Sequence, residues 1–404
     1  MARYLLKRAL WGIITLFIFI TIIFFVAQVI LPGDYASQFR LFLSGEEVDQ
    51  LREGLGLNLP LWKQYLNWLQ NLARGDLGLA FNGQPVGEIL LSVLPLTIFL
   101  FGLGTLIAFL GGQWLGKVTA WRSSRVSSGT ATFAAIMLYT SFPPWLAFLM
   151  TYFIARRLQV FRNLFDLESS RQIWLEYDTP SVTILWYMLL TVAALAVLVF
   201  IVNRILRRSE PRQLPAILVI LLFLVAPIAI WYVLGFGPQA MDILFTLLLP
   251  LLTYVLLSFG ETTLIMRTSM ADTVNQEYIF TARAKGLPEK AVRDKHAARN
   301  ALLPVFSRLI TSIPYLLTGL VIIEYSFGFS RLSGLVTLSQ SPATWGGLGS
   351  AMFGSLVQQN MGIVMGALLV VGILSLIARL FLDVLHAYLD PRIRYGESRT
   401  GGVS

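Results

Sequence analysis

The sequence alternates between long apolar runs and shorter polar segments. Each apolar run is about 20 residues or longer, which is the length that an α-helix needs to cross the hydrocarbon core of a bilayer. A helix satisfies its own backbone polar groups there, so the pattern predicts an all-α polytopic membrane protein with about eight transmembrane helices. The predicted spans cover residues 9–31, 95–116, 130–155, 181–202, 214–234, 243–266, 305–327 and 361–382.

The segment between the first two spans is polar and is expected on the outer side of the membrane. Two short helices are predicted in it, at residues 46–53 and 61–72, with a Gly- and Pro-containing break between them. The second helix carries aromatic side chains suited to a membrane surface, namely Trp62, Tyr65 and Trp68.

Basic residues mark the segments that are expected in the cytoplasm. Arg3, Lys7 and Arg8 precede the first run, which lacks the short apolar core and the cleavage site of a signal peptide, so we expect an uncleaved helix. An even number of spans then leaves both termini in the cytoplasm. The predicted divisions are an N-terminal transmembrane helix at 1–31, an extracytoplasmic segment at 32–93, a transmembrane domain at 94–395 and a flexible cytoplasmic tail at 396–404.

Composition supports a membrane protein and excludes several kinds of site. Hydrophobic residues make up 56% of the chain and charged residues 13%, about half the charged share of a soluble domain. The net charge of +9 comes from basic residues spread over short loops, so it does not indicate nucleic-acid binding. The chain has no cysteine and two histidines, which excludes disulfides, thiolate catalysis and metal sites built on Cys or on several His. We therefore predict no catalytic and no metal-binding residue.

Three local features of the spans carry further expectations. Gly112 and Gly116 form a GxxxG pair, which predicts close packing of the second span against another helix. The Pro143-Pro144 pair predicts a kink in the third span, with or without a role in lining a path. Glu324 is expected at the outer membrane boundary, because a carboxylate at mid-membrane costs roughly 2.5–3.5 kcal/mol on insertion scales.

The most polar long run lies between the spans at 243–266 and 305–327. Four acids and seven bases fall between Arg267 and Asn300. The run predicts a helix at 277–285, a break at Gly286, and a second helix that starts near Pro288 and ends at about residue 303. A basic hairpin lying on anionic lipid would give a similar pattern, so it is an alternative.

Two parts of this run resemble the cytoplasmic loop of ABC-importer permeases. They are Thr-Ala-Arg-Ala-Lys-Gly-Leu at 281–287 and His-Ala-Ala-Arg-Asn-Ala-Leu-Leu-Pro at 296–304. The similarity is to the dipeptide/oligopeptide branch of binding-protein-dependent transport, and to its first, B-type, permease subunit. Family-like stretches cover about residues 1–155 and 240–395, among them the Asp-Pro-Arg-Ile-Arg ending at 390–394.

In that family the loop forms a coupling helix that seats in a groove of an ATPase subunit, so the resemblance implies a coupling loop at 267–303. Ala282 and Gly286 would be its close-packing positions. Phe280 is a departure, since many ABC permeases have Glu there. The residues implied in ATPase coupling are Glu277, Thr281, Ala282, Arg283, Ala284, Lys285, Gly286, Leu287, His296, Arg299, Asn300 and Pro304.

Members of the family typically have six spans. The resemblance therefore implies that two of the eight predicted spans, at about 181–236, are an insertion. A basic link at 203–212 joins this pair. The pair preserves the orientation of the remaining spans and is expected at the periphery of the protein.

The resemblance implies the permease subunit of an importer in a prokaryotic cytoplasmic (inner) membrane. The chain has no Walker phosphate loop, so it is expected to bind no cofactor, with ATP and Mg on partner subunits. The implied partners are a second homologous permease, two cytoplasmic ATPases and an extracytoplasmic substrate-binding protein. A secondary ion-coupled transporter and a membrane scaffold are the alternatives. Peptide is the default cargo of the branch, nickel, glutathione and sugar occur among relatives, and no substrate-binding residue is predicted.

Overall fold

A computed structural model provides the fold. It describes residues 2–30, 43–54, 56–80, 83–121, 126–155, 173–174, 179–209, 215–332, 346–358 and 360–389, together with Ala36 and Phe39. The Asp-Pro-Arg-Ile-Arg ending, the tail at 396–404 and most of the segment at 156–178 lie outside the described residues.

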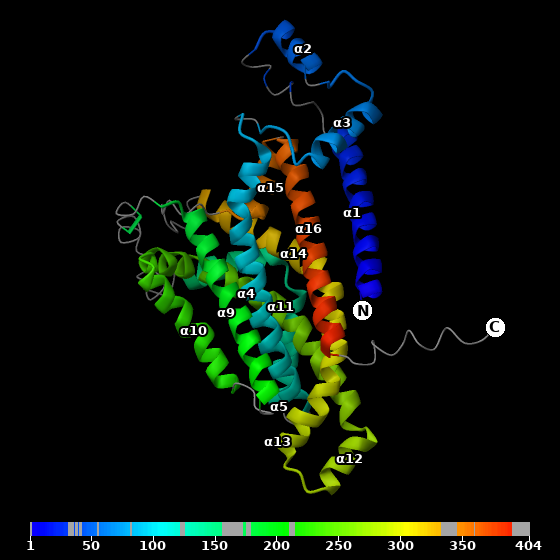
Figure 1. Cartoon of the computed structure of the whole chain (residues 1–404), viewed down its shortest axis with the longest axis vertical. Helices are drawn as coiled ribbons and strands as arrows, with labels where there is room; N and C mark the ends of the chain where they lie inside the picture. The colour runs from blue at the N-terminus through cyan, green and yellow to red at the C-terminus, as the bar shows by residue number, and fades with distance from the viewer. Residues whose placement is uncertain are drawn as a thin grey trace, which may run out of the picture.

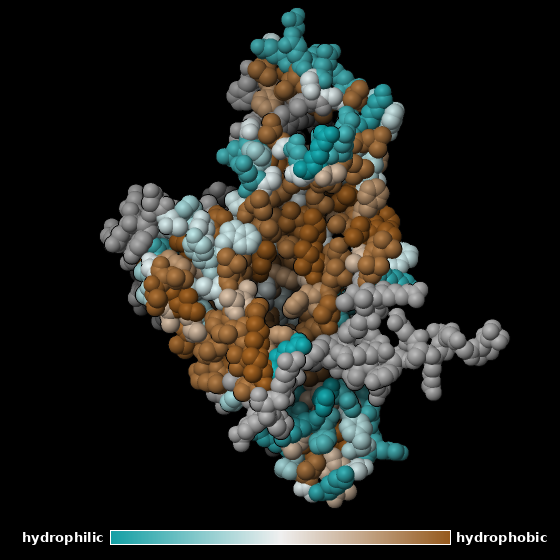
Figure 2. All heavy atoms as spheres, in the orientation of Figure 1, coloured by the Kyte–Doolittle hydropathy of each residue, from teal (hydrophilic) through white to brown (hydrophobic). Residues whose placement is uncertain are grey.

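The described residues are almost entirely helical, with one isolated bridge between Leu79 and Pro85, so the predicted fold class is confirmed. Long helices run side by side in the middle of the molecule, while α2 and α3 project at one end and α12 and α13 at the other (Figure 1). An apolar band separates two polar ends, as expected for a protein that crosses a bilayer (Figure 2). The long helices are α1 (Ala2–Ile30), α4 (Val86–Trp121), α9 (Ser181–Ser209), α11 (Gly237–Val274), α14 (Ala298–Leu332) and α16 (Met361–Leu389).

All eight predicted spans are helical, and six of them form helices that are long and apolar enough to cross a membrane, counted over the described part of the chain. The other two differ from simple spans. The apolar part of α10 (Ala216–Val233) is shorter, at Leu218–Val233. The third span is a bent pair of helices, in which Ser128–Thr140 and Pro143–Ile154 meet at 111°.

The bend in the third span follows from its two prolines. A residue before proline is pushed out of the helical region, and Phe142 is extended, with φ −70° and ψ 121°. The proline pair then starts a new helix, because it needs no backbone donor in the first turn. The span therefore consists of α5 (Val126–Thr140), α6 (Pro143–Leu149) and a π-helical turn, η2 (Met150–Ala155), so the predicted kink is a complete change of direction.

Close contact between α4 and α11 forms the centre of the fold. A Cβ added to Gly112 would lie 2.7 Å from Cβ of Thr262, and one added to Gly116 would lie 2.6 Å from Cβ of Met266. Gly104 meets the ring of Tyr254 in the same way. The predicted packing of the GxxxG pair against another helix is confirmed, and α11 is that helix.

Glu324 is a buried charge, whereas the sequence analysis expected a boundary residue instead. Only 5% of the residue is exposed, and its carboxylate accepts hydrogen bonds of 2.8 Å from the Thr97 hydroxyl of α4 and from the backbone N–H of Gly349. Gly349 lies in the first turn of α15 (Leu348–Val357), a short helix that the sequence analysis did not predict. The carboxylate is tolerated because the helix end and the hydroxyl satisfy it.

The two helices predicted between the first two spans are confirmed as α2 (Gly45–Gly54) and α3 (Leu61–Ala73). At the start of α2, Ser44 and Glu47 bond each other's backbone N–H groups in a capping box, and the Ser44 N–H holds the pKa of the Glu47 carboxyl below its usual value. Tyr65 and Trp68 of α3 contact Phe24 of α1. Their ring centres lie 5.2 and 5.3 Å, respectively, from the ring centre of Phe24. The aromatic side chains thus attach α3 to the outer end of α1.

The predicted inserted pair, α9 and α10, lies at one edge of the molecule (Figure 1). The start of α9 and the end of α10 nevertheless enter the main core, where Ile184 and Met188 are fully buried. Trp231 of α10 donates a hydrogen bond of 2.8 Å to Thr191 of α9. Much of the surface of α9 and α10 is exposed and apolar. The part nearest α4 and α11 is buried and packs in the same core as those two helices.

We predict that Gly112→Leu separates α4 from α11 and destabilises the protein. Overpacking of this kind costs about 1–3 kcal/mol, so the thermal unfolding midpoint of the purified protein should fall. Gly102→Leu is the matched control, because no atom lies within 4 Å of a Cβ added there. Equal midpoints for the two variants would contradict the role of the α4–α11 contact.

Candidate functional site

The polar run between α11 and α14 folds into a hairpin of residues 277–297. Its first arm is α12 (Glu277–Ala284), and its second arm is α13 (Glu289–Ala291) followed by a π-helical turn, η3 (Val292–Ala297). Gly286 between the arms has φ +71°, a conformation that suits glycine, so the predicted break is confirmed. The hairpin projects beyond the apolar band, and its surface is largely hydrophilic with some apolar patches (Figures 1 and 2).

The second arm continues directly into the next span. Helix α14 starts at Ala298 and runs through Pro304, so the prediction that Pro304 begins a separate span is wrong. Asn300, whose carbonyl would bond residue 304 in a regular helix, is exposed, so water can satisfy that carbonyl. The hairpin and α14 therefore form one continuous structural unit.

An apolar cluster fixes the hairpin to the bundle. Ile279 and Ala282 on the inner face of α12 are buried against Met266 and Met270 of α11 and against Val292 of η3. The small side chain of Ala282 thus packs within the chain rather than on its surface. The cluster holds the two arms in a defined orientation.

Charged contacts add to this attachment. The Arg283 guanidinium lies 5.3 Å from the ring centre of Trp121 in α4, and its Nε donates a hydrogen bond of 3.0 Å to Glu289 across the Gly286 turn. Nζ of Lys117 in α4 lies 3.6 Å from Oδ1 of Asp294. The Asp294 carboxylate also accepts two hydrogen bonds from the Arg293 guanidinium. Each exposed pair contributes little alone, but together they connect α4 to both arms.

The predicted coupling residues divide into one buried and many exposed side chains. Ala282 is buried, and the others lie exposed on the hairpin and on the first turns of α14. The sequence analysis noted Phe280 only as a departure, yet it is 57% exposed and lies on the outer face of α12. Trp121, Lys117 and Asp294 were missed, because their contacts join segments far apart in the sequence.

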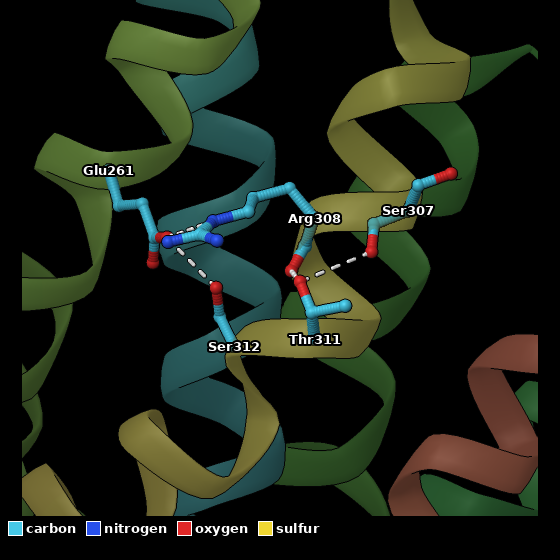
Figure 3. A network of polar contacts seen from close by, with 5 residues as sticks. All are labelled: Glu261, Ser307, Arg308, Thr311 and Ser312. Atoms are coloured by element: carbon cyan, nitrogen blue, oxygen red, sulfur yellow. Dashed lines mark hydrogen bonds and ion pairs between the residues drawn. The ribbon is translucent and has the colours of Figure 1, made fainter.

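A second polar site lies between α11 and α14, partly buried and partly exposed (Figure 3). Glu261 of α11 accepts a hydrogen bond of 2.9 Å from Nε of Arg308 and one of 2.8 Å from the Ser312 hydroxyl, both on the same carboxylate oxygen. The Glu261 side chain is 10% exposed, whereas that of Arg308 is 55% exposed. An ion pair in a membrane span is unusual, and one signal was available, since both charges interrupt apolar runs.

A cavity of about 160 Å³ adjoins Glu261, the acidic member of this pair. Side chains from α5, α11 and α14 form much of its wall, and they combine apolar surface with hydroxyl groups and one carboxylate. The polar members of the lining are Tyr139, Tyr254, Ser258, Glu261, Tyr315 and Thr318.

Comparison with known proteins identifies relatives of the whole chain. Residues 212–395 match the sequence model of the family described as binding-protein-dependent transport system inner membrane component, and residues 1–100 match that of the N-terminal membrane component of such systems. The first match includes α10, so it begins inside the predicted insertion.

Among curated proteins, the chain is 27% identical to an oligopeptide transport system permease protein of Bacillus subtilis, over 98% of this chain and 100% of the relative. It is 27% identical to a dipeptide transport system permease protein of Lactococcus lactis, with 98% and 100% covered. A dipeptide transport system permease protein of Escherichia coli is 25% identical, with 98% and 99% covered.

Proposed function

The chain belongs to the family of binding-protein-dependent transport system inner membrane components, and on this premise we propose that it forms part of the path by which peptides enter the cell. Its relatives are named as oligopeptide and dipeptide transport permeases, which supports peptide as the cargo. The transporter would contain a second homologous permease, two cytoplasmic ATPases and an extracytoplasmic binding protein. ATP and Mg would be bound by the ATPase subunits.

The observation that carries the proposal is the hairpin at residues 277–297. It is held by α4 and α11, is continuous with α14, and presents Phe280 and Leu287 as exposed apolar side chains among charges. An apolar centre with a charged rim is the usual composition of a protein interface. A groove on an ATPase subunit would therefore receive Phe280 and Leu287, with Glu277, Thr281, Lys285 and the exposed residues at 296–304 around them.

We predict that peptide uptake through the assembled transporter depends on ATP. Proteoliposomes containing the complete complex should accumulate a labelled peptide when the binding protein and ATP are supplied, and intact-complex mass spectrometry should find the ATPase subunits bound. A secondary transporter would instead follow an ion gradient without ATP, and a scaffold would transport nothing. Uptake that persists without ATP but stops when the ion gradient is abolished would contradict the proposal.

We also propose that both termini lie in the cytoplasm. The first turns of α9 pack with Leu96 and Leu100 in the N-terminal half of α4, and Ala147 of α6 joins the same cluster, which supports a bent third span that crosses to the side where α4 begins. Reporter fusions at residues 60, 170, 238 and 345 should report outside, and a fusion at 208 should report inside. An inside report at 170 together with an outside report at 208 would refute this topology.

We predict that Gly286→Val disrupts coupling. A β-branched residue at φ +71° is strained by on the order of 1–3 kcal/mol, while the membrane spans are untouched, so abundance should stay near normal. Less ATPase should co-purify, or ATP hydrolysis should continue without transport. Gly286→Asn is the matched control, because asparagine tolerates the left-handed conformation. If the valine variant keeps its ATPase and transports normally, the coupling assignment is wrong.

A further inference from the structure

One face of α14 is exposed and polar along its membrane-spanning part. The exposed positions follow a helical spacing of three or four residues and comprise Ser307, Arg308, Thr311, Tyr315 and Thr318. By contrast, the large exposed side chains of α1, α9 and α10 are mostly Leu, Ile, Phe and Val, which suit lipid tails. The two kinds of surface therefore have different surroundings.

Arg308 indicates that the polar face of α14 does not face lipid. The hydroxyls of Ser307, Thr311 and Thr318 donate to carbonyls of their own helix, so lipid would tolerate them. A guanidinium is costly to expose to lipid tails, and ionisable residues in spans usually face a polar cavity or pathway. The face of α14 that carries Arg308 is accordingly expected to face a water-filled path.

The Glu261–Arg308 contact orients the guanidinium without covering it. Glu261 holds Nε, and Ser312 fixes the same carboxylate oxygen from the next turn of α14 (Figure 3). More than half of the Arg308 side chain remains accessible, so part of the guanidinium can meet a molecule in the path.

Given the proposed function as a peptide permease, we propose that Arg308 is a contact point for the C-terminal carboxylate of the peptide in transit. A guanidinium matches a carboxylate in geometry and charge. The paired Glu261 offsets part of its attraction, which favours brief binding, and a transport path requires contacts weak enough to release the solute. The cavity of about 160 Å³ begins at Glu261 and is lined further along α14 by Tyr315 and Thr318, so it offers apolar and hydroxyl surface to the neighbouring part of the peptide.

The test compares one peptide as its free acid and as its C-terminal amide. Uptake of each is measured in proteoliposomes that contain the complete complex and an unchanged binding protein, together with ATP hydrolysis. Arg308→Gln should reduce uptake of the acid several-fold more than uptake of the amide, and ATP hydrolysis stimulated by the binding protein should continue. Because the binding protein is constant, its own preference cancels when each variant is compared with the wild type.

Two further variants separate recognition from structure. Arg308→Lys keeps the charge but not the planar guanidinium, so it should retain part of the preference for the acid; it also serves if the glutamine variant does not assemble. Thr311→Val changes the same face without removing charge and should leave the preference unchanged. Equal loss of both peptides together with loss of ATP hydrolysis would show a purely structural role and overturn the proposal, as would an unchanged preference. Absence of any peptide uptake by the wild type would instead refute the proposed function.

Discussion

Helices α4 and α11 lie so close together that three positions of α4 have room only for glycine. A Cβ added to Gly104, Gly112 or Gly116 would collide with Tyr254, Thr262 or Met266 of α11, respectively. Helices in a bilayer gain little from the hydrophobic effect when they associate, so close packing of this kind has to hold them together. The other long elements are arranged around the pair. Helix α11 bonds α14 through Glu261, and α4 reaches α15 through Thr97.

Elements that depend only on residues close together in the sequence were predicted correctly. Apolar runs predicted the spans because a bilayer imposes one length on every crossing helix. The break at Gly286 followed from the residue that best adopts a left-handed conformation, and the outer helices α2 and α3 followed from their flanking Gly and Pro residues. The packing role of Gly112 and Gly116 was predictable too, although the partner helix was not.

Other features depend on contacts between distant segments, which a single sequence does not reveal. Glu324 looked like a boundary residue because its partners, Thr97 and Gly349, belong to other helices. Helix α15 was missed because it is too short to be a span and its first N–H groups donate to the side chains of Thr97 and Glu324, which belong to other helices. For the candidate site, the exposed positions on the hairpin were predictable from the resemblance, whereas Trp121 and Lys117, which hold it, were not.

The uninterrupted course of α14 connects the two ends of the molecule. One end continues into the hairpin through η3, and near the other end Glu324 binds the first turn of α15. Because one helix links the two regions, a displacement of the hairpin is transmitted along α14 to its contact with α15, and the two internal prolines, Pro304 and Pro314, are the points where the helix can bend and absorb part of that displacement.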